Sequence, residues 1–170
     1  MSHVSIQYYK TTYGELILGA YDNQLCLCDW RYRKMRASID ARIQKHLDAN
    51  YLEESHPVIS RTIEELTEYF AGKRKAFDVP MLFAGSEFQR SVWNALIQVS
   101  YGETSTYQKL SDSLGNSKAI RAVAAANGAN AISILVPCHR IIGSDGSLVG
   151  YAGGLQTKQK LLELEQSLLI

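Results

Sequence analysis

Cysteine, proline and long apolar runs are scarce in this sequence, and each scarcity excludes a class of protein. The 170 residues include three cysteines and three prolines, which is too few thiols for the disulfide framework of a small secreted domain. No apolar run approaches the ~20 residues that a membrane span needs, and the start, MSHVSIQYYK, lacks the apolar core of a secretory signal. We therefore expect a cytoplasmic protein with reduced thiols and no membrane partner.

A surplus of positive charge is missing as well. The chain has 18 Lys and Arg residues against 17 Asp and Glu residues, for a net charge of +1, and residues 86–170 alone hold seven basic and six acidic side chains. This balance carries no global signature of nucleic-acid binding, so any contact with DNA must be local. The 46% hydrophobic content suffices for a packed core in one sizeable domain or two small ones.

The first 80 residues have the pattern of a sheet followed by helices. Alternating apolar residues in VSIQYY, ELILGAY and LCLCDW, separated by the turn-like TTYG and DNQ, predict an antiparallel meander. Helices are predicted over residues 37–49 and 57–72, the second with Pro57 in its first turn. Cys26 and Cys28 lie two apart on a predicted strand, where core packing is favoured over half of a metal site because no pair of histidines has metal-ligand spacing.

The second half is predicted to contain a helix-turn-helix. Ser86 begins S-E-F-Q, a capping box, and the helix that follows has an apolar face formed by Phe88, Val92, Trp93, Leu96 and Ile97. STYQKLSDSLG, with a second capping box at Ser105 and Gln108, is followed closely by KAIRAVAAAN. That last helix is rich in alanine, which suits either a narrow DNA groove or close helix packing.

The segment ILVPCHRII places Cys138 where a predicted strand, residues 134–136, ends at a proline. Neighbours on an extended strand point to opposite faces, so a water relay between Cys138 and His139 is easier to build than a direct hydrogen bond. The relay would remove the thiol proton, since only the thiolate is strongly nucleophilic. The alternative is an apolar core cysteine beside an ordinary histidine. Either Glu163 or Glu165 in the last predicted helix could orient the histidine, and a solvated helix face also explains both.

Residues from Ser86 onward resemble the O6-alkylguanine-DNA alkyltransferases, also called methylated-DNA-protein-cysteine methyltransferases. The hallmark of that family is PCHR with an asparagine eight residues before the cysteine, here Asn130. The resemblance extends through GETSTYQKL, NSKAIRAVAAANGAN, ILVPCHRII and GYAGGLQTKQKLLELE in the family's order and spacing. It implies an α+β fold with two domains. Residues 1–80 would form a ribonuclease-H-like domain with an antiparallel sheet and helices, whose role stays open. Residues 81–170 would form a helical winged helix-turn-helix domain that binds DNA and accepts the alkyl group.

By this resemblance, Cys138 attacks the carbon on guanine O6 and keeps it as a thioether, so each protein molecule reacts once. Glu165, His139 and a water would yield the thiolate. The family's last helix commonly reads LLxHE, whereas this chain has LLELE, so Leu164 replaces a histidine while the glutamate position is retained. Glu165 is therefore preferred to Glu163. No cofactor and no metal are expected.

The resemblance also assigns residues to the DNA and to the base. Arg121 would enter the base stack in place of the flipped nucleotide, and Tyr107 would crowd the 3′ phosphate and offer its hydroxyl to guanine N3. Asn130 would brace the turn between the DNA-reading helix and the cysteine loop. Further implied contacts are those of Ala122 and Ala125 with the minor groove, of Tyr151 and Ala152 with the base and alkyl group, and of Lys158 near that pocket. Many relatives have serine where Ala152 stands.

The expected partner is thus double-stranded DNA bearing O6-alkylguanine, with O4-alkylthymine left open, and the protein is expected to act as a monomer. Two rival functions remain. A non-catalytic lesion sensor of the same fold would bind alkylguanine without accepting the group, although such relatives have tryptophan in place of the cysteine. A redox switch or cysteine hydrolase would leave Arg121 and Tyr107 without a role.

Overall fold

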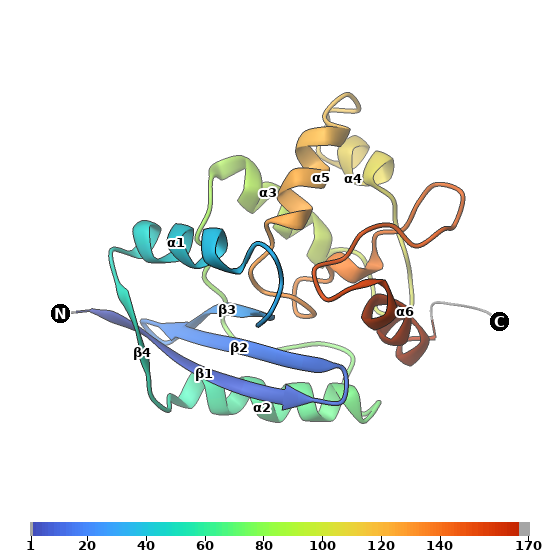
Figure 1. The fold of residues 1–170 in the computed structure, drawn as a ribbon. Coiled ribbons are helices and arrows are strands. Elements are labelled where there is room, and N and C mark those ends of the chain that lie inside the picture. The colour runs from blue at the N-terminus through green and yellow to red at the C-terminus, as the bar shows by residue number, and fades with distance from the viewer. Residues whose placement is uncertain (1, 167–170) are drawn as a thin grey trace. The chain divides into compact units, whose positions relative to one another are not determined.

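The computed structural model describes residues 2–166, which form two compact units divided between Gly85 and Ser86. The boundary expected from the sequence, after residue 80, lies a few residues earlier. The first unit contains a four-stranded sheet with two helices, and the second is mainly helical (Figure 1). This arrangement confirms the expected α+β class. Within residues 2–166, no helix has both the length and the apolar character needed to cross a membrane.

The sheet of the first unit has the strand order β3-β2-β1-β4. Strands β1 (His3–Thr11), β2 (Gly14–Tyr21) and β3 (Gln24–Trp30) pair antiparallel, which confirms the predicted meander, and β4 (Asn50–Glu53) pairs parallel to β1. Asp22 and Asn23 have φ angles of +50° and +62°, which is the geometry of a two-residue hairpin turn. The sequence did not predict β4 because its four residues are mostly exposed and show no apolar alternation.

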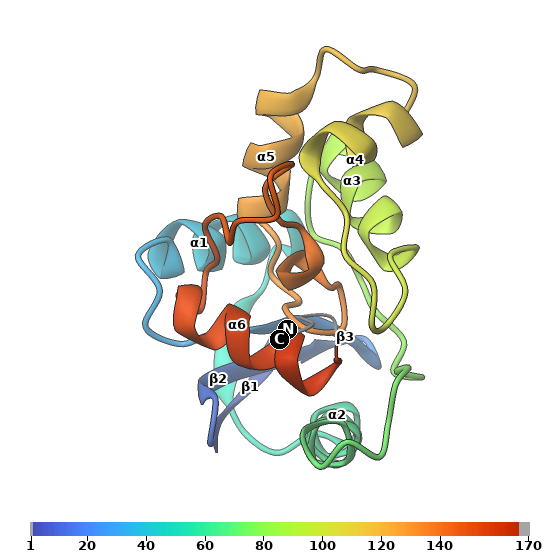
Figure 2. The same cartoon turned by 90° about the vertical axis from the view of Figure 1, so that its right-hand side faces the viewer.

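Helices α1 (Arg36–Leu47) and α2 (Pro57–Phe70) lie on opposite faces of this sheet (Figures 1 and 2). Strands β2 and β3 are consequently buried along most of their length. Cys26 and Cys28 lie in this core, and burial raises the pKa of Cys26 to about 12. The prediction that these two cysteines are core residues is confirmed.

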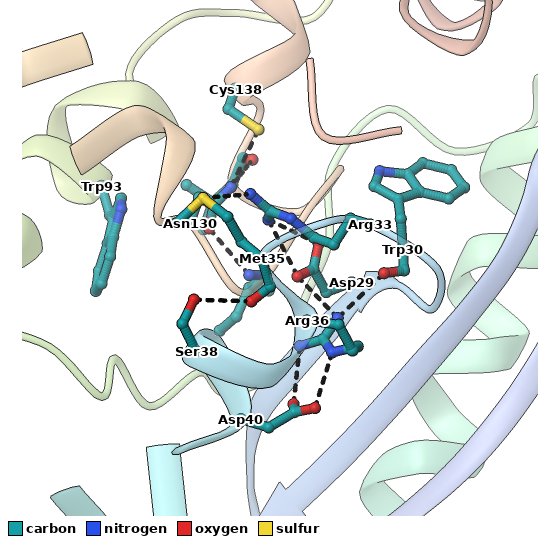
Figure 3. A network of polar contacts seen from close by, with 12 residues as sticks. Asp29, Trp30, Arg33, Met35, Arg36, Ser38, Asp40, Trp93, Asn130 and Cys138 are labelled. Carbon is teal, nitrogen blue, oxygen red and sulfur yellow. Dashed lines mark hydrogen bonds and ion pairs between the residues drawn. The ribbon is translucent and has the colours of Figure 1, made fainter. Parts of the chain in front are cut away.

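A buried ion cluster joins α1 to β3. Asp29 is fully buried, and its carboxylate accepts hydrogen bonds from Arg33 at 3.1 Å and from Arg36 at 3.0 Å. Arg36 also donates to both carboxylate oxygens of Asp40, one turn further along α1, and to the Trp30 carbonyl (Figure 3). Such partners are required because an unpaired charge in a protein interior is costly.

In the second unit, α3 (Glu87–Ile97) packs against the helix pair α4 (Tyr107–Ser113) and α5 (Ile120–Gly128) (Figure 2). The indole Nε1 of Trp93 donates to the Ala126 carbonyl at 2.8 Å, which joins α3 to α5. The centre of the predicted apolar face of α3 is buried. Phe88 and Ile97, near the two ends of α3, belong to the same face but are 40% and 36% exposed.

The starts of α3 and α4 test the two predicted capping boxes. At α3 the box is confirmed, because Ser86 Oγ accepts from the Gln89 amide and the Gln89 side chain accepts from the Ser86 amide. At α4 the prediction is wrong, since Thr106 rather than Ser105 is the N-cap and accepts from the Lys109 amide. The backbone of Ser105 is instead paired with the segment after Arg140, so its chain stays extended and the helix begins one residue later.

The prediction of a strand over residues 134–136 is also wrong. This segment forms a tight turn in which Ile134 has a φ of +74°, and Ser133 and Val136 make an isolated bridge. After Pro137 the chain enters a 3-10 turn, η1 (Cys138–Arg140), and further on it forms α6 (Leu155–Leu164). Apolar residues at 134–136 reflect burial of the turn in the core of the second unit rather than strand pairing.

Candidate active site around Cys138

Cys138 begins the 3-10 turn and is 4% exposed. Its sulfur accepts a hydrogen bond from the side-chain amide of Asn130, with Nδ2 3.3 Å from Sγ (Figure 3). The same Nδ2 donates to the Val136 carbonyl at 3.0 Å, and Oδ1 accepts from the Ile132 amide at 2.9 Å. Hydrogen bonds donated to a thiol sulfur favour its ionised form. Asn130 therefore contacts both the sulfur and the backbone of the turn that carries it.

The backbone of this turn is strained at Ile134. Ile134 has a φ of +74°, which lies in the left-handed region of backbone conformation. This region costs free energy for a β-branched residue, and such outliers concentrate at functional sites. The bonds from Asn130 to Ile132 and Val136 enclose Ile134 on both sides. The asparagine side chain thus holds the turn in a conformation that its own residues do not favour.

His139 has no exposed surface. Its Nε2 lies 2.8 Å from Oε2 of Glu165, while Nδ1 is buried without a hydrogen-bond partner in the described part of the chain. A carboxylate only accepts hydrogen bonds, so the imidazole proton belongs on Nε2 and Nδ1 carries the lone pair. Burial lowers the pKa of His139, against the opposing effect of Glu165. His139 is therefore neutral at pH 7 and has one basic nitrogen free.

Glu165 lies at the C-terminal end of α6 and is 2% exposed. Its oxygens accept from Arg140 Nε at 2.9 Å and Arg140 Nη2 at 3.0 Å as well as from His139. Burial alone would raise the pKa of this carboxyl, but the bonds from His139 and Arg140 outweigh it and lower the pKa to about 2. Glu163 is exposed. The structure thus places Glu165, and not Glu163, against the histidine.

Sequence reasoning missed Arg140, which is 6% exposed. Besides its bonds to Glu165, its Nη1 donates to the Val99 carbonyl at 2.6 Å, and its guanidinium lies over the Tyr101 ring at 5.7 Å. Tyr101 in turn donates to the Leu164 carbonyl at 3.3 Å. An arginine within an apolar run is a usable signal, because a buried guanidinium requires an anionic partner.

Lys158 and Tyr151 follow Cys138 in the chain. Lys158 is 1% exposed, and its ammonium donates to the carbonyls of Ile141 and Val149. These bonds tie both ends of the segment 141–149 to α6, and burial lowers the pKa of Lys158 to about 8. The Tyr151 ring lies edge-on to the His139 ring with centroids 6.4 Å apart. Tyr151 and Ala152 are half-buried, and a pocket formed by Tyr151, Ala152 and Lys158 stays a prediction.

The helix pair exposes the side chains that were assigned to DNA. Arg121, Ala122 and Ala125 are exposed on one face of α5, while Val123, Ala126 and Asn127 form its buried face. Tyr107 is the first residue of α4 and is half-buried. The outer face of α5 is therefore slim, with one long side chain and two methyl groups.

The residues described in the structure do not include any cluster of three or more His, Cys, Asp or Glu side chains suited to a metal ion. Asn130 donates a hydrogen bond to the Cys138 sulfur, and Lys158 and Tyr107 interact with Cys138 electrostatically. A hydrogen-bond donor and a nearby ammonium group both favour the ionised form of a thiol.

Comparison with known protein families covers both units. Residues 4–83 match the family described as 6-O-methylguanine DNA methyltransferase, ribonuclease-like domain, and residues 87–167 match its DNA binding domain. The chain is 45% identical over 123 residues to the inducible methylated-DNA-protein-cysteine methyltransferase of Bacillus subtilis. The aligned residues span 72% of this chain and 69% of the relative. The chain belongs to the methylated-DNA-protein-cysteine methyltransferase family.

Two further members support this assignment. The methyltransferase of Methanosarcina acetivorans is 55% identical over 103 residues, which span 61% of this chain and 66% of the relative, just under two thirds of its length. The structure of Mycobacterium tuberculosis O6-methylguanine methyltransferase is 36% identical with a TM-score of 0.80, covering 96% of this chain and 93% of that chain. A structure of the same mycobacterial protein in complex with DNA gives a TM-score of 0.81.

The comparisons extend the family assignment to the first unit. From the sequence, this unit resembled the methyltransferase family only in length and in the order of its strands and helices. The match over residues 4–83 confirms the expected ribonuclease-like domain. The assignment to this family therefore rests on both units of the chain.

Proposed function

We propose that this protein repairs DNA by moving an alkyl group from O6 of guanine to Sγ of its own Cys138. The observation that carries the proposal is the arrangement of polar groups around the sulfur. Asn130 donates to Sγ, while His139 presents an unprotonated Nδ1 and is held by the ionised Glu165. A water between Nδ1 and Sγ would pass the thiol proton to His139 and leave a thiolate.

The reaction we propose is a single displacement at carbon. The thiolate electron pair forms the new S–C bond as the C–O6 bond breaks, and the electron pair of that bond stays on the guanine. Tyr107 would offer its hydroxyl proton to N3 of the departing base. A carbon–sulfur thioether has no good leaving group at neutral pH, and Cys138 is the only cysteine among residues 86–170, so we infer that each molecule reacts once.

The buried position of Cys138 requires the base to leave the duplex. Extrusion of a nucleotide costs a few kcal/mol of lost stacking and pairing. The exposed face of α5 would lie in the minor groove, with Ala122 and Ala125 against the sugars and Arg121 filling the space of the flipped base. We infer that the substrate is double-stranded DNA bearing O6-alkylguanine and that the protein acts as a monomer without a cofactor.

The experiment that tests the proposal is incubation with a duplex containing O6-methylguanine, followed by mass spectrometry of the digested protein. We expect one methyl group on the peptide that contains Cys138, and no methyl group in a Cys138→Ser variant that still binds the duplex. Cys26→Ala, which changes a buried cysteine in the first unit, should retain the adduct. Binding without any adduct in the wild-type protein would instead indicate a lesion sensor.

Arg121→Ala should slow transfer from duplex DNA by about a hundredfold, because the variant no longer compensates for part of the extrusion cost. Transfer from the free base O6-benzylguanine should slow far less, since no nucleotide has to be extruded. The rates are measured by quenching the reaction and quantifying alkylated Cys138. Lys160→Ala removes an exposed positive charge from α6 and is the matched control. Equal slowing with both substrates would contradict intercalation by Arg121.

A further inference from the structure

A polar contact joins the two helices of the helix pair. Asn127 lies on the buried face of α5 and is 7% exposed. Its Nδ2 donates to the hydroxyl of Tyr107 on α4 at 3.4 Å, while its Oδ1 is buried and has no hydrogen-bond partner within residues 2–166. A buried amide with one end unsatisfied is less favourable than an apolar side chain of similar size. Packing between α4 and α5 therefore does not explain why asparagine occupies this position.

The contact determines what the Tyr107 hydroxyl can do. A phenol hydroxyl has one proton to donate and lone pairs that accept. Because the Asn127 amide donates to the oxygen, the hydroxyl proton is not used in this contact and stays available to another acceptor. Burial raises the pKa of Tyr107, and the bond from Asn127 opposes that rise without cancelling it. The hydroxyl therefore keeps its proton at neutral pH.

We propose that Asn127 is a positioning residue, which fixes the Tyr107 hydroxyl as a hydrogen-bond donor toward the extruded nucleotide. The proposal rests on the function proposed above, in which Tyr107 faces that nucleotide. Asn127 itself lies on the buried face of α5, opposite the exposed face formed by Arg121, Ala122 and Ala125. It acts on the reaction only through Tyr107.

Asn127→Asp reverses the contact while keeping the shape of the side chain. A carboxylate only accepts, so it takes the Tyr107 proton that the nucleotide requires. We expect transfer from an O6-methylguanine duplex to slow on the order of tenfold, the kinetic equivalent of one hydrogen bond. In a Tyr107→Phe background, the same substitution should have no further effect, because the hydroxyl is absent. If the double variant transfers the methyl group more slowly than Tyr107→Phe alone, the proposal is overturned.

Asn127→Leu separates positioning from packing. The substitution removes the unsatisfied Oδ1, so Tm should equal or exceed that of the wild type while transfer still slows. A fall in Tm that parallels the fall in rate indicates a structural role and overturns the proposal. Ser111→Ala is the matched control, because Ser111 Oγ on the buried face of α4 also has no partner within residues 2–166. If Ser111→Ala slows transfer as much, any polar change between α4 and α5 suffices, and the proposal fails.

A second measurement needs neither DNA nor transfer. The pKa of Tyr107 is read from ring carbon shifts of 13C-tyrosine protein, with the signal assigned by its loss in Tyr107→Phe. Removal of the Asn127 donor in Asn127→Leu should raise this pKa, and an unchanged pKa overturns the proposal. If the wild-type protein fails to methylate Cys138, the proposed function is wrong, and the titration still decides whether Asn127 acts on the Tyr107 hydroxyl.

Discussion

Glu165→Gln is expected to slow methyl transfer about a hundredfold and to lower the free energy of unfolding by about 3–5 kcal/mol. Glu165 is buried and accepts from both His139 and Arg140. The substitution removes one negative charge and leaves the buried Arg140 guanidinium without a counterion. It also replaces one acceptor oxygen by an amide donor, so the tautomer of His139 that leaves Nδ1 basic is no longer favoured. Transfer rate and urea unfolding are the measurements.

The matched control is Glu163→Gln, the same chemical change two residues earlier at an exposed position. This variant should retain both the wild-type rate and the wild-type stability. If Glu163→Gln and Glu165→Gln have equal effects, the contacts of Glu165 do not determine the activity, and the proposed relay is wrong.

The contribution of Glu165 to the free energy of unfolding should depend on pH. The pKa of Glu165 falls from an ordinary 4.5 to about 2 on folding, so the unfolded chain binds more protons between these values and stability declines with falling pH. The contribution of Glu165 is therefore complete above about pH 4.5 and is lost as the pH approaches 2. The stability difference between wild type and Glu165→Gln should shrink over this interval. A difference that does not change with pH would contradict an ionised Glu165.

Asn130→Asp is expected to slow transfer about a hundredfold at neutral pH and to destabilise the protein by about 2–4 kcal/mol. The acceptor for the Ile132 amide is kept, but the donors to Cys138 Sγ and to the Val136 carbonyl are lost. The new carboxylate would also repel the negative charge of an ionised Cys138 sulfur, which the Asn130 side chain contacts in the wild type. A carboxylate beside the sulfur disfavours its ionised form, so the variant should regain part of its rate, relative to the wild type at the same pH, as the pH rises.

Asn94→Asp introduces the same charge on the exposed face of α3 and serves as the control. Its transfer rate and its pH profile should match those of the wild type. A constant loss of rate at every pH in Asn130→Asp would show that the asparagine acts only through the backbone of the turn and not on the sulfur.

Local sequence patterns predicted the elements whose stabilising contacts are close in the chain. The capping box at Ser86 and the position of Pro57 at the start of α2 depend on residues within one helical turn, and both are present. The turn at Asp22 and Asn23 has the same character. These features were predictable because the interacting groups are also neighbours in the sequence.

The predictions that failed involve partners far apart in the chain. Ser105 cannot cap α4 because its backbone pairs with residues beyond Arg140. Residues 134–136 cannot form a strand because Asn130 closes a turn around Ile134. Arg140 was overlooked because its anionic partner lies 25 residues away. The choice of Glu165 over Glu163 came from the resemblance, since helical periodicity does not distinguish the two when the histidine's position is unknown. The structure places the Glu165 carboxylate 2.8 Å from His139 Nε2, and the role of Glu165 in the relay stays a prediction.

The pairing of Ser105 has a mechanical consequence. The Ser105 amide donates to the carbonyl of Arg140, and the Ser105 carbonyl accepts from the amide of Ile142, each at 2.9 Å. These two backbone hydrogen bonds join the segment before α4 to the segment after the reactive turn. Tyr107 lies two residues after Ser105 on one side of this pair of hydrogen bonds, and Cys138 lies two residues before Arg140 on the other. A displacement of the first turn of α4 would therefore reach the turn that carries Cys138 through these two hydrogen bonds and the few residues on either side of them.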